Sequence, residues 1–203
     1  MLSTYYPYKS QAGWLEVISG CMFSGKTEEL IRQIRRAELA RQTVQVFKPR
    51  IDNRYHESDI ASHSKVRQPS KVVDSAVEIL ALVQANTKVV GIDEAQFFDD
   101  NIVNVAQRLV DRGHRVLVAG LDTDWRGRPF GPMPNLLSLA DVIRKQYAIC
   151  TVCGEQATRT QRVVLDSNDI VVGAQDFYEA RCRAHFDPEF SFKIKNTCES
   201  VSN

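Results

Sequence analysis

The sequence GCMFSGKT, residues 20–27, decides the fold of this 203-residue chain. It fits the phosphate-loop pattern G-x-x-x-x-G-K-[ST], in which glycines at both ends let the backbone curl and point successive N–H groups at phosphate oxygens. Residues 14–19 before it (WLEVIS) predict a strand, and the residues from Glu28 onward predict a helix, whose N-terminus adds positive potential. This strand–loop–helix unit predicts a site for a nucleoside triphosphate.

The side chains and the backbone of the phosphate loop (residues 20–27) have separate expected tasks. Lys26 is expected to reach the β- and γ-phosphates, and the hydroxyl group of Thr27 to bind Mg²⁺. The rest of the predicted phosphate site is formed by the other loop positions, namely Gly20, Met22, Phe23, Ser24 and Gly25.

Composition narrows the class of protein. The chain carries 26 basic and 25 acidic residues, a net charge of +1, and this balance argues against a dedicated nucleic-acid binder, which normally has a basic face. Residues 1–13 do not join a basic region to an apolar run, so we expect no signal peptide, and no stretch approaches the roughly 18 apolar residues of a membrane span. We therefore expect a soluble, cytoplasmic protein whose five cysteines serve as metal ligands or free thiols.

Alternating strand and helix patterns predict an α/β domain over residues 14–149, built as a RecA-like P-loop parallel sheet flanked by helices. A leader (1–13), a small zinc-binding lobe (150–190) and a tail (191–203) complete the expected organisation. Residues 50–71 are polar without a clear period, so we expect a long loop there. The strands are predicted at residues 14–19, 43–47, 88–92, 115–119 and 142–148, and the helices at 28–41, 76–83, 102–110 and 136–140.

Two acidic residues follow the apolar run that ends at Ile92. A phosphate-loop enzyme needs an acid at the end of a neighbouring strand to help hold Mg²⁺, which favours Asp93 in that role. Glu94 is adjacent and is a candidate for the base that takes a proton from an acceptor hydroxyl. Two alternatives remain at this stage: Glu94 orients water in an ATPase, or both acids only cap the next helix.

Four residues near the C-terminus have metal-ligand spacing. Cys150-x-x-Cys153 and Cys182-x-x-His185 are separated by 28 residues, and each pair can supply two corners of a tetrahedron from one tight turn. Four protein ligands leave no open position, so a structural Zn²⁺ is expected, and its binding would help a small lobe to fold. A redox role for the first pair is the weaker alternative, because it leaves the second pair unexplained.

The phosphate loop, an acidic strand end and paired zinc ligands in this order resemble the small, zinc-containing thymidine kinases. The resemblance runs from about residue 14 to residue 186. Its motifs are GCMFSGKT (20–27), IDNRY (51–55), IDEAQFF (92–98) and LDTDWRGRPFGP (121–132).

The resemblance implies roles for particular residues. Glu94 would be the general base on the 5′-hydroxyl of the nucleoside, and Asp93 would support Mg²⁺. Asp52 would assist the metal, and Arg54 would neutralise charge on the phosphoryl group during transfer. A loop of the zinc lobe, residues 163–178, would close over the nucleoside. The matching thymine pocket would consist of Met22, Phe97, Leu121, Trp125, Thr160, Val172 and Tyr178.

The implied activity is ATP-dependent phosphorylation of thymidine, with deoxyuridine as a second substrate, to give the nucleoside 5′-monophosphate. The resemblance also implies a homotetramer that is inhibited by dTTP. Two other functions stay open from the sequence. One is a RecA-like ATPase with a zinc ribbon, and the other is a zinc-ribbon binding module with a vestigial nucleotide site.

Overall fold

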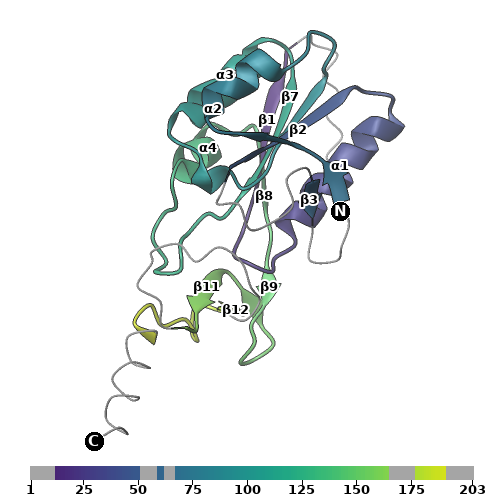
Figure 1. Ribbon diagram of the computed structural model, residues 1–203. Coiled ribbons are helices and arrows are strands. Elements are labelled where there is room, and N and C mark those ends of the chain that lie inside the picture. The colour runs from purple at the N-terminus through teal and green to yellow at the C-terminus, as the bar shows by residue number, and fades with distance from the viewer. Residues whose placement is uncertain (1–11, 51–58, 62–66, 165–176, 191–203) are drawn as a thin grey trace, which may run out of the picture.

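The computed structural model describes residues 12–50, 59–61, 67–164 and 177–190 (Figure 1). Its centre is a six-stranded sheet in which every pair of neighbouring strands is parallel. The strand order is β5 (Lys71–Val73), β2 (Val44–Pro49), β6 (Val89–Ile92), β7 (Arg115–Gly120), β1 (Trp14–Ser19) and β8 (Val142–Lys145). The predicted parallel α/β sheet is therefore confirmed.

Helices cover both faces of this sheet, because successive strand residues point to opposite sides. Leu15 and Val17 of β1 belong to a core under three helices, whereas Ile18 belongs to a second core under α1. The helices are α1 (Lys26–Leu39) on one face and α2 (Ala76–Leu82), α3 (Asn101–Asp111) and α4 (Met133–Leu139) on the other (Figure 1). In the part of the chain that the structure describes, no helix is both long and apolar enough to span a bilayer.

Two sequence expectations about regular structure were wrong. The strand expected over 142–148 is divided into β8 and a separate β9 (Ala148–Ile149). The Gln146 N–H still donates to the Ser19 carbonyl of β1, but residues 148–149 pair with residues 156–157 outside the main sheet. The segment expected as a loop over 50–71 contains paired strands of three residues, which are too short to show a period. These are the antiparallel pair β3 (Asp59–Ala61) and β4 (Arg67–Pro69), and the start of β5.

A small lobe of antiparallel strands follows the sheet. In it, β9 pairs with β10 (Gln156–Ala157), and β11 (Arg159–Arg162) pairs with β12 (Tyr178–Arg181). Its small core contains Cys150 together with Cys21 of the phosphate loop, so the lobe packs against the nucleotide-binding end of the main sheet. The expected tail and all but the last two residues of the expected leader lie outside the described residues.

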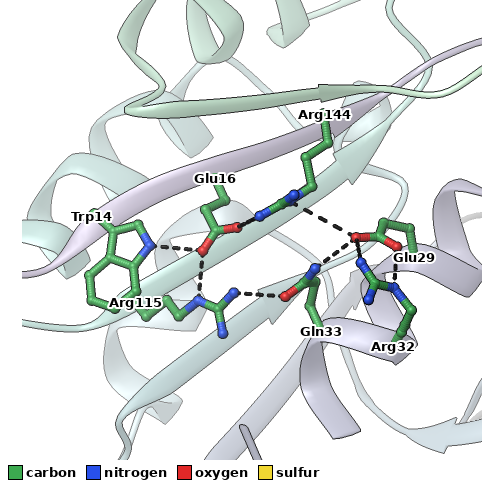
Figure 2. A network of polar contacts seen from close by, with 7 residues as sticks. All are labelled: Trp14, Glu16, Glu29, Arg32, Gln33, Arg115 and Arg144. Carbon is green, nitrogen blue, oxygen red and sulfur yellow. Dashed lines mark hydrogen bonds and ion pairs between the residues drawn. The ribbon is translucent and has the colours of Figure 1, made fainter. Parts of the chain in front are cut away.

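A buried acidic side chain fastens the sheet to α1 (Figure 2). Glu16 of β1 is only 3% exposed and accepts hydrogen bonds from Arg115 Nε of β7 at 2.7 Å, from Arg144 Nη2 of β8 at 3.1 Å and from the Trp14 indole at 2.8 Å. The two arginines continue the network to α1, where their partners are Gln33 and Glu29. One carboxylate therefore links three neighbouring strands and a helix.

The electrostatics of Glu16 follow from these contacts. Burial by itself would raise the pKa of this carboxyl group, but the hydrogen bond and the charge of Arg115, with smaller effects of Trp14 and Arg144, lower its pKa below the ordinary value. A depressed pKa in the folded state contributes stability above the unfolded-state pKa of about 4.3, and this contribution is lost as pH falls through the folded-state pKa.

We predict that Glu16→Gln lowers the free energy of unfolding by about 3 kcal/mol at pH 7, because two half-buried arginines lose their buried, ionised partner. The difference from wild type should shrink as pH falls below about 4.3, since protonation removes the same charge. Asp74→Asn is the control: its ion pair with Arg50 is exposed and should contribute less than about 1 kcal/mol. Urea titrations at several pH values measure both, and equal effects of the two substitutions would contradict the prediction.

Candidate functional site

The phosphate loop is shaped by close backbone packing at its first residue. Gly20 has φ 151°, and a Cβ atom there would lie 2.5 Å from the carbonyl oxygen of Gln146 and 2.7 Å from Ser24 Oγ. The Ser24 hydroxyl donates across the loop to the Cys21 carbonyl at 2.7 Å. Any side chain at position 20 would force the loop away from the strand end, so its curvature depends on glycine.

The neighbouring strands β7 and β8 are joined beside the start of this loop. Lys145, the last residue of β8, forms an ion pair of 2.7 Å with Asp122, which lies just beyond β7. Because β1 lies between these two strands, the pair spans the strand end from which the phosphate loop emerges. This ion pair therefore helps to fix the strand end at which the phosphate loop begins.

Phosphate-loop and acidic side chains meet at the carboxyl end of the sheet. Thr27 Oγ1 donates to Asp93 Oδ2 at 3.3 Å, and Lys26 Nζ donates to the carbonyl of Cys21 at 2.8 Å. Burial lowers the pKa of Lys26, while the charge of Glu94, followed by Cys21, Asp93 and others, acts to raise it. One hydroxyl, one amine and two carboxylates thus lie together, as the sequence predicted for this group.

The charge of Asp93 is sensitive to what binds beside it. Burial, reinforced by the Glu94 carboxylate, raises the pKa of Asp93 to about 7, against the lowering effects of the Glu94 N–H, Lys26 and Thr27. A divalent cation at the Thr27–Asp93 pair would favour the ionised carboxylate, and these hard oxygen ligands are the kind that Mg²⁺ prefers. The residues present therefore fit a magnesium ion.

Glu94 has an unusual backbone conformation. Its φ of 52° lies in the left-handed region, which costs a residue with a side chain about 1–3 kcal/mol and which proteins keep mostly at functional sites. The turn leads from β6 into η1, a 3₁₀ helix at Ala95–Phe97, and leaves the Glu94 carboxylate half-buried next to Asp93. Phe23 of the phosphate loop has φ 64°, so two strained residues lie in this site.

The small lobe contacts the phosphate loop at two successive residues. The thiol of Cys21 donates to the carbonyl of Ala157 at 3.3 Å, and the backbone N–H of Met22 donates to Thr160 Oγ1 at 3.0 Å. Thr160 is 2% exposed, so water cannot readily replace it as the acceptor. The conformation of the phosphate loop therefore depends on β11 of the small lobe.

The described residues of the expected nucleoside pocket lie on the phosphate loop, η1, the loop after β7, β11 and β12. Phe97 of η1 contacts Phe130 edge-to-face at a centroid distance of 5.5 Å, and Leu121 follows β7. Trp125 lies under the guanidinium groups of Arg126 (4.3 Å) and Arg162 (4.9 Å).

Of the remaining expected nucleoside residues, Met22 and Thr160 are in direct contact, and Tyr178 is buried in β12, beside β11. Val172 and the expected phosphoryl-transfer residues Asp52 and Arg54 lie outside the described residues, as does most of the expected 163–178 loop.

Sequence reasoning missed two residues that organise this site. Gln96 bonds to Glu94 and to the backbone of Leu121, and Arg162 joins the small lobe to Trp125. Gln96 lies inside the quoted IDEAQFF motif, which was the available signal. Arg162 had none, because a lone arginine in a short strand reads as a surface charge.

The four predicted metal ligands come together. Cys150, Cys153, Cys182 and His185 form a cluster whose ligand atoms all lie within 4.8 Å of one another. The separations are 3.8 Å between the sulfurs of Cys153 and Cys182, and 3.3 and 3.8 Å from His185 Nδ1 to the sulfurs of Cys182 and Cys150. Tetrahedral Zn²⁺ with ordinary bond lengths requires about 3.8 Å between sulfurs and about 3.6 Å between sulfur and nitrogen. The cluster could therefore bind zinc.

The state of Cys150 also suits a metal. Burial opposes its ionisation, but hydrogen bonds from the backbone of Cys182, Val152 and Cys153 lower the pKa of its thiol to about 5. A thiolate is the form in which cysteine binds a metal.

Comparison with known proteins identifies the family. A family model described as thymidine kinase matches residues 13–186. This chain belongs to the thymidine kinase family. It is 55% identical over 199 residues to a thymidine kinase of Bdellovibrio bacteriovorus, an alignment that covers 96% of this chain and 98% of that one. It is 54% identical over 176 residues to a thymidine kinase of a Rhodothermus species, with 87% and 82% covered.

A solved structure was also matched. The genome packaging NTPase B204 of Sulfolobus turreted icosahedral virus 2, in complex with ATP-γS, is 18% identical with a TM-score of 0.40, over 68% of this chain and 75% of that one. The resemblance inferred from the motifs is confirmed by the family model and the thymidine kinase relatives.

We predict that the purified chain binds one Zn²⁺ and that its removal by a chelator lowers the melting temperature, because the small lobe has a core of few residues. Cys153→Ala should abolish stoichiometric metal binding, whereas Cys21→Ala, outside the cluster, should retain it. Elemental analysis combined with calorimetry measures both. Full zinc content in Cys153→Ala would contradict the four-ligand site.

We also predict that Thr160→Val weakens binding of a non-hydrolysable ATP analogue about 10-fold, because the Met22 N–H loses its buried acceptor. Thr160→Ser keeps the hydroxyl and is the matched control. The affinity is measured by calorimetry without nucleoside, so that a direct contact of Thr160 with a base does not contribute. Wild-type affinity in Thr160→Val would show that the phosphate loop does not depend on this bond.

Proposed function

We propose that this protein transfers the γ-phosphoryl group of ATP to the 5′-hydroxyl of thymidine, and also of deoxyuridine, to give the nucleoside monophosphate for DNA synthesis. One observation supports this most directly. In a chain of the thymidine kinase family, the Thr27 hydroxyl of the phosphate loop is hydrogen-bonded to Asp93, and the Glu94 carboxylate follows directly. The groups that would bind the triphosphate and the metal, and the carboxylate that would accept the hydroxyl proton, therefore lie at one edge of the sheet.

The proposed mechanism relies on position and charge. The backbone N–H groups of the phosphate loop and Lys26 bind the phosphates and neutralise charge that spreads over the transferred group. Thr27 and Asp93, with Asp52, would hold Mg²⁺, which would supply positive charge beside the triphosphate. Glu94 takes the proton of the 5′-hydroxyl as the oxygen of that hydroxyl bonds to the γ-phosphorus, while the bond from the γ-phosphorus to the β–γ bridging oxygen breaks and ADP leaves. Arg54 is proposed to neutralise the phosphoryl group further.

The nucleoside is proposed to bind between the end of β7 and the small lobe. Leu121 and Trp125 come from the main domain, and Thr160 and Tyr178 from the lobe, with Val172 in the segment that would close over the base. A structural Zn²⁺ in the Cys/His cluster would hold together the two chain segments that flank this closing segment.

Further expectations rest on the family resemblance. We propose that the protein is a cytoplasmic homotetramer, that dTTP inhibits it, and that it acts without binding nucleic acid. The near-neutral net charge of +1 supports the last of these.

The decisive experiment follows label from γ-labelled ATP with thymidine present. We expect label on the nucleoside, and Glu94→Gln should lower kcat by about 10²- to 10⁴-fold because the amide cannot accept the proton. Affinity for ATP should remain close to that of wild type. Glu38→Gln, an exposed change of the same kind at the end of α1, should leave kcat unchanged.

Other outcomes would reject the proposal. Label released as inorganic phosphate without transfer would favour the RecA-like ATPase, and absence of turnover would favour a binding module. Undiminished kcat in Glu94→Gln would remove this residue as the base.

A further inference from the structure

Gln96 lies between the proposed base and the proposed nucleoside pocket. Its side-chain Nε2 donates to Glu94 Oε2 at 2.5 Å, and its Oε1 accepts the backbone N–H of Leu121 at 3.0 Å. The residue is 3% exposed. One buried amide therefore connects the Glu94 carboxylate to the end of β7, where the nucleoside is proposed to bind.

The bond to Leu121 settles the direction of the amide group. A backbone N–H can only donate, so the oxygen of the Gln96 amide must face Leu121, and its NH₂ group must face Glu94. The reverse orientation would oppose two donors at Leu121 and two acceptors at Glu94. The NH₂ group of Gln96 therefore donates to one particular oxygen of the Glu94 carboxylate, Oε2.

Two glycines keep Gln96 in this place. A Cβ atom at Gly120 would lie 2.8 Å from Gln96 Oε1 and 2.6 Å from the Met133 sulfur, and a Cβ atom at Gly131 would overlap the Gln96 carbonyl oxygen. The surrounding backbone is thus packed directly against both the main chain and the side chain of Gln96. A side chain enclosed in this way has little rotamer freedom, so it can fix the group to which it bonds.

We propose that Gln96 is a positioning residue for catalysis: it holds Glu94 Oε2, which leaves Oε1 to receive the proton of the 5′-hydroxyl. The inference rests on the proposed function, since it assigns Glu94 the role of base. Glu94 needs such support because it is half-buried on a left-handed backbone turn and bears a side chain with three rotatable bonds. Displacement of a catalytic base by about 1 Å lowers the reaction rate on the order of 100-fold.

The test replaces the amide without changing the size of the side chain. Gln96→Met removes both hydrogen bonds, and Gln96→Glu keeps an acceptor for Leu121 but, when ionised, offers no donor to Glu94. Both variants should lower kcat about 10- to 100-fold, with KM for ATP within about 3-fold of wild type. The second variant keeps the test valid if the first fails to fold.

A double-mutant cycle separates positioning from a general structural role. In a Glu94→Ala background no carboxylate remains to be positioned, so adding Gln96→Glu should change the residual rate less than about 3-fold. Equal losses in both backgrounds would overturn the inference, because Gln96 would then act independently of Glu94. Wild-type kcat in both single Gln96 variants would overturn it as well.

Two further measurements keep the conclusions apart. If Glu94→Ala itself retains full activity, the proposed base is wrong; if it is inactive while the Gln96 variants are fully active, only the positioning role is wrong. Gln33→Met is the matched control, because Gln33 is equally buried and bonds to Glu29 and Arg115 on the other face of the sheet. It should leave kcat unchanged even if it lowers the melting temperature.

Discussion

The parallel pairing of β1, β6 and β7 is the constraint on which this site depends. Parallel strands carry their carboxyl ends to the same edge of a sheet, so the segments that follow them must meet there. The phosphate loop leaves β1, Asp93 and Glu94 follow β6, and Leu121 follows β7. Residues 66 and 25 positions apart in the chain are therefore hydrogen-bonded neighbours. The hydrogen bonds Thr27–Asp93 and Gln96–Leu121 form because the segments that follow these strands meet at this edge.

Two clusters of polar groups in the sheet, one on the α1 face and one at the carboxyl edge, differ in role. On the α1 face, the Glu16 network has a full set of partners, and its contribution is structural: it joins three strands to a helix. At the carboxyl edge, burial and the nearby charges, that of Glu94 among them, perturb the pKa of Lys26 and that of Asp93. Perturbed pKa values of this kind cluster at functional sites. Stability and function are thus assigned to separate polar clusters.

The small lobe is in direct contact with the candidate site. Its strand β11 supports the phosphate loop through Thr160 and reaches the loop after β7 through Arg162 and Trp125. Both ends of the lobe meet at the Cys/His cluster, so the stability of that cluster bears on the position of β11. A metal ion bound at this cluster would thereby affect the conformation of the phosphate loop.

The sequence by itself determined the phosphate loop, the alternating strands and helices, the acidic strand end and the four ligands of the Cys/His cluster. Each of these is local: its signal lies in a few consecutive residues or in a fixed spacing. Tertiary structure alone decided the strand order, the three-residue strands within 50–71 and the break between β8 and β9. It also decided that Gln96 bonds to Glu94 and that Thr160 supports Met22. These features come from contacts between distant segments, and no local pattern of residues encodes which segments will pack together.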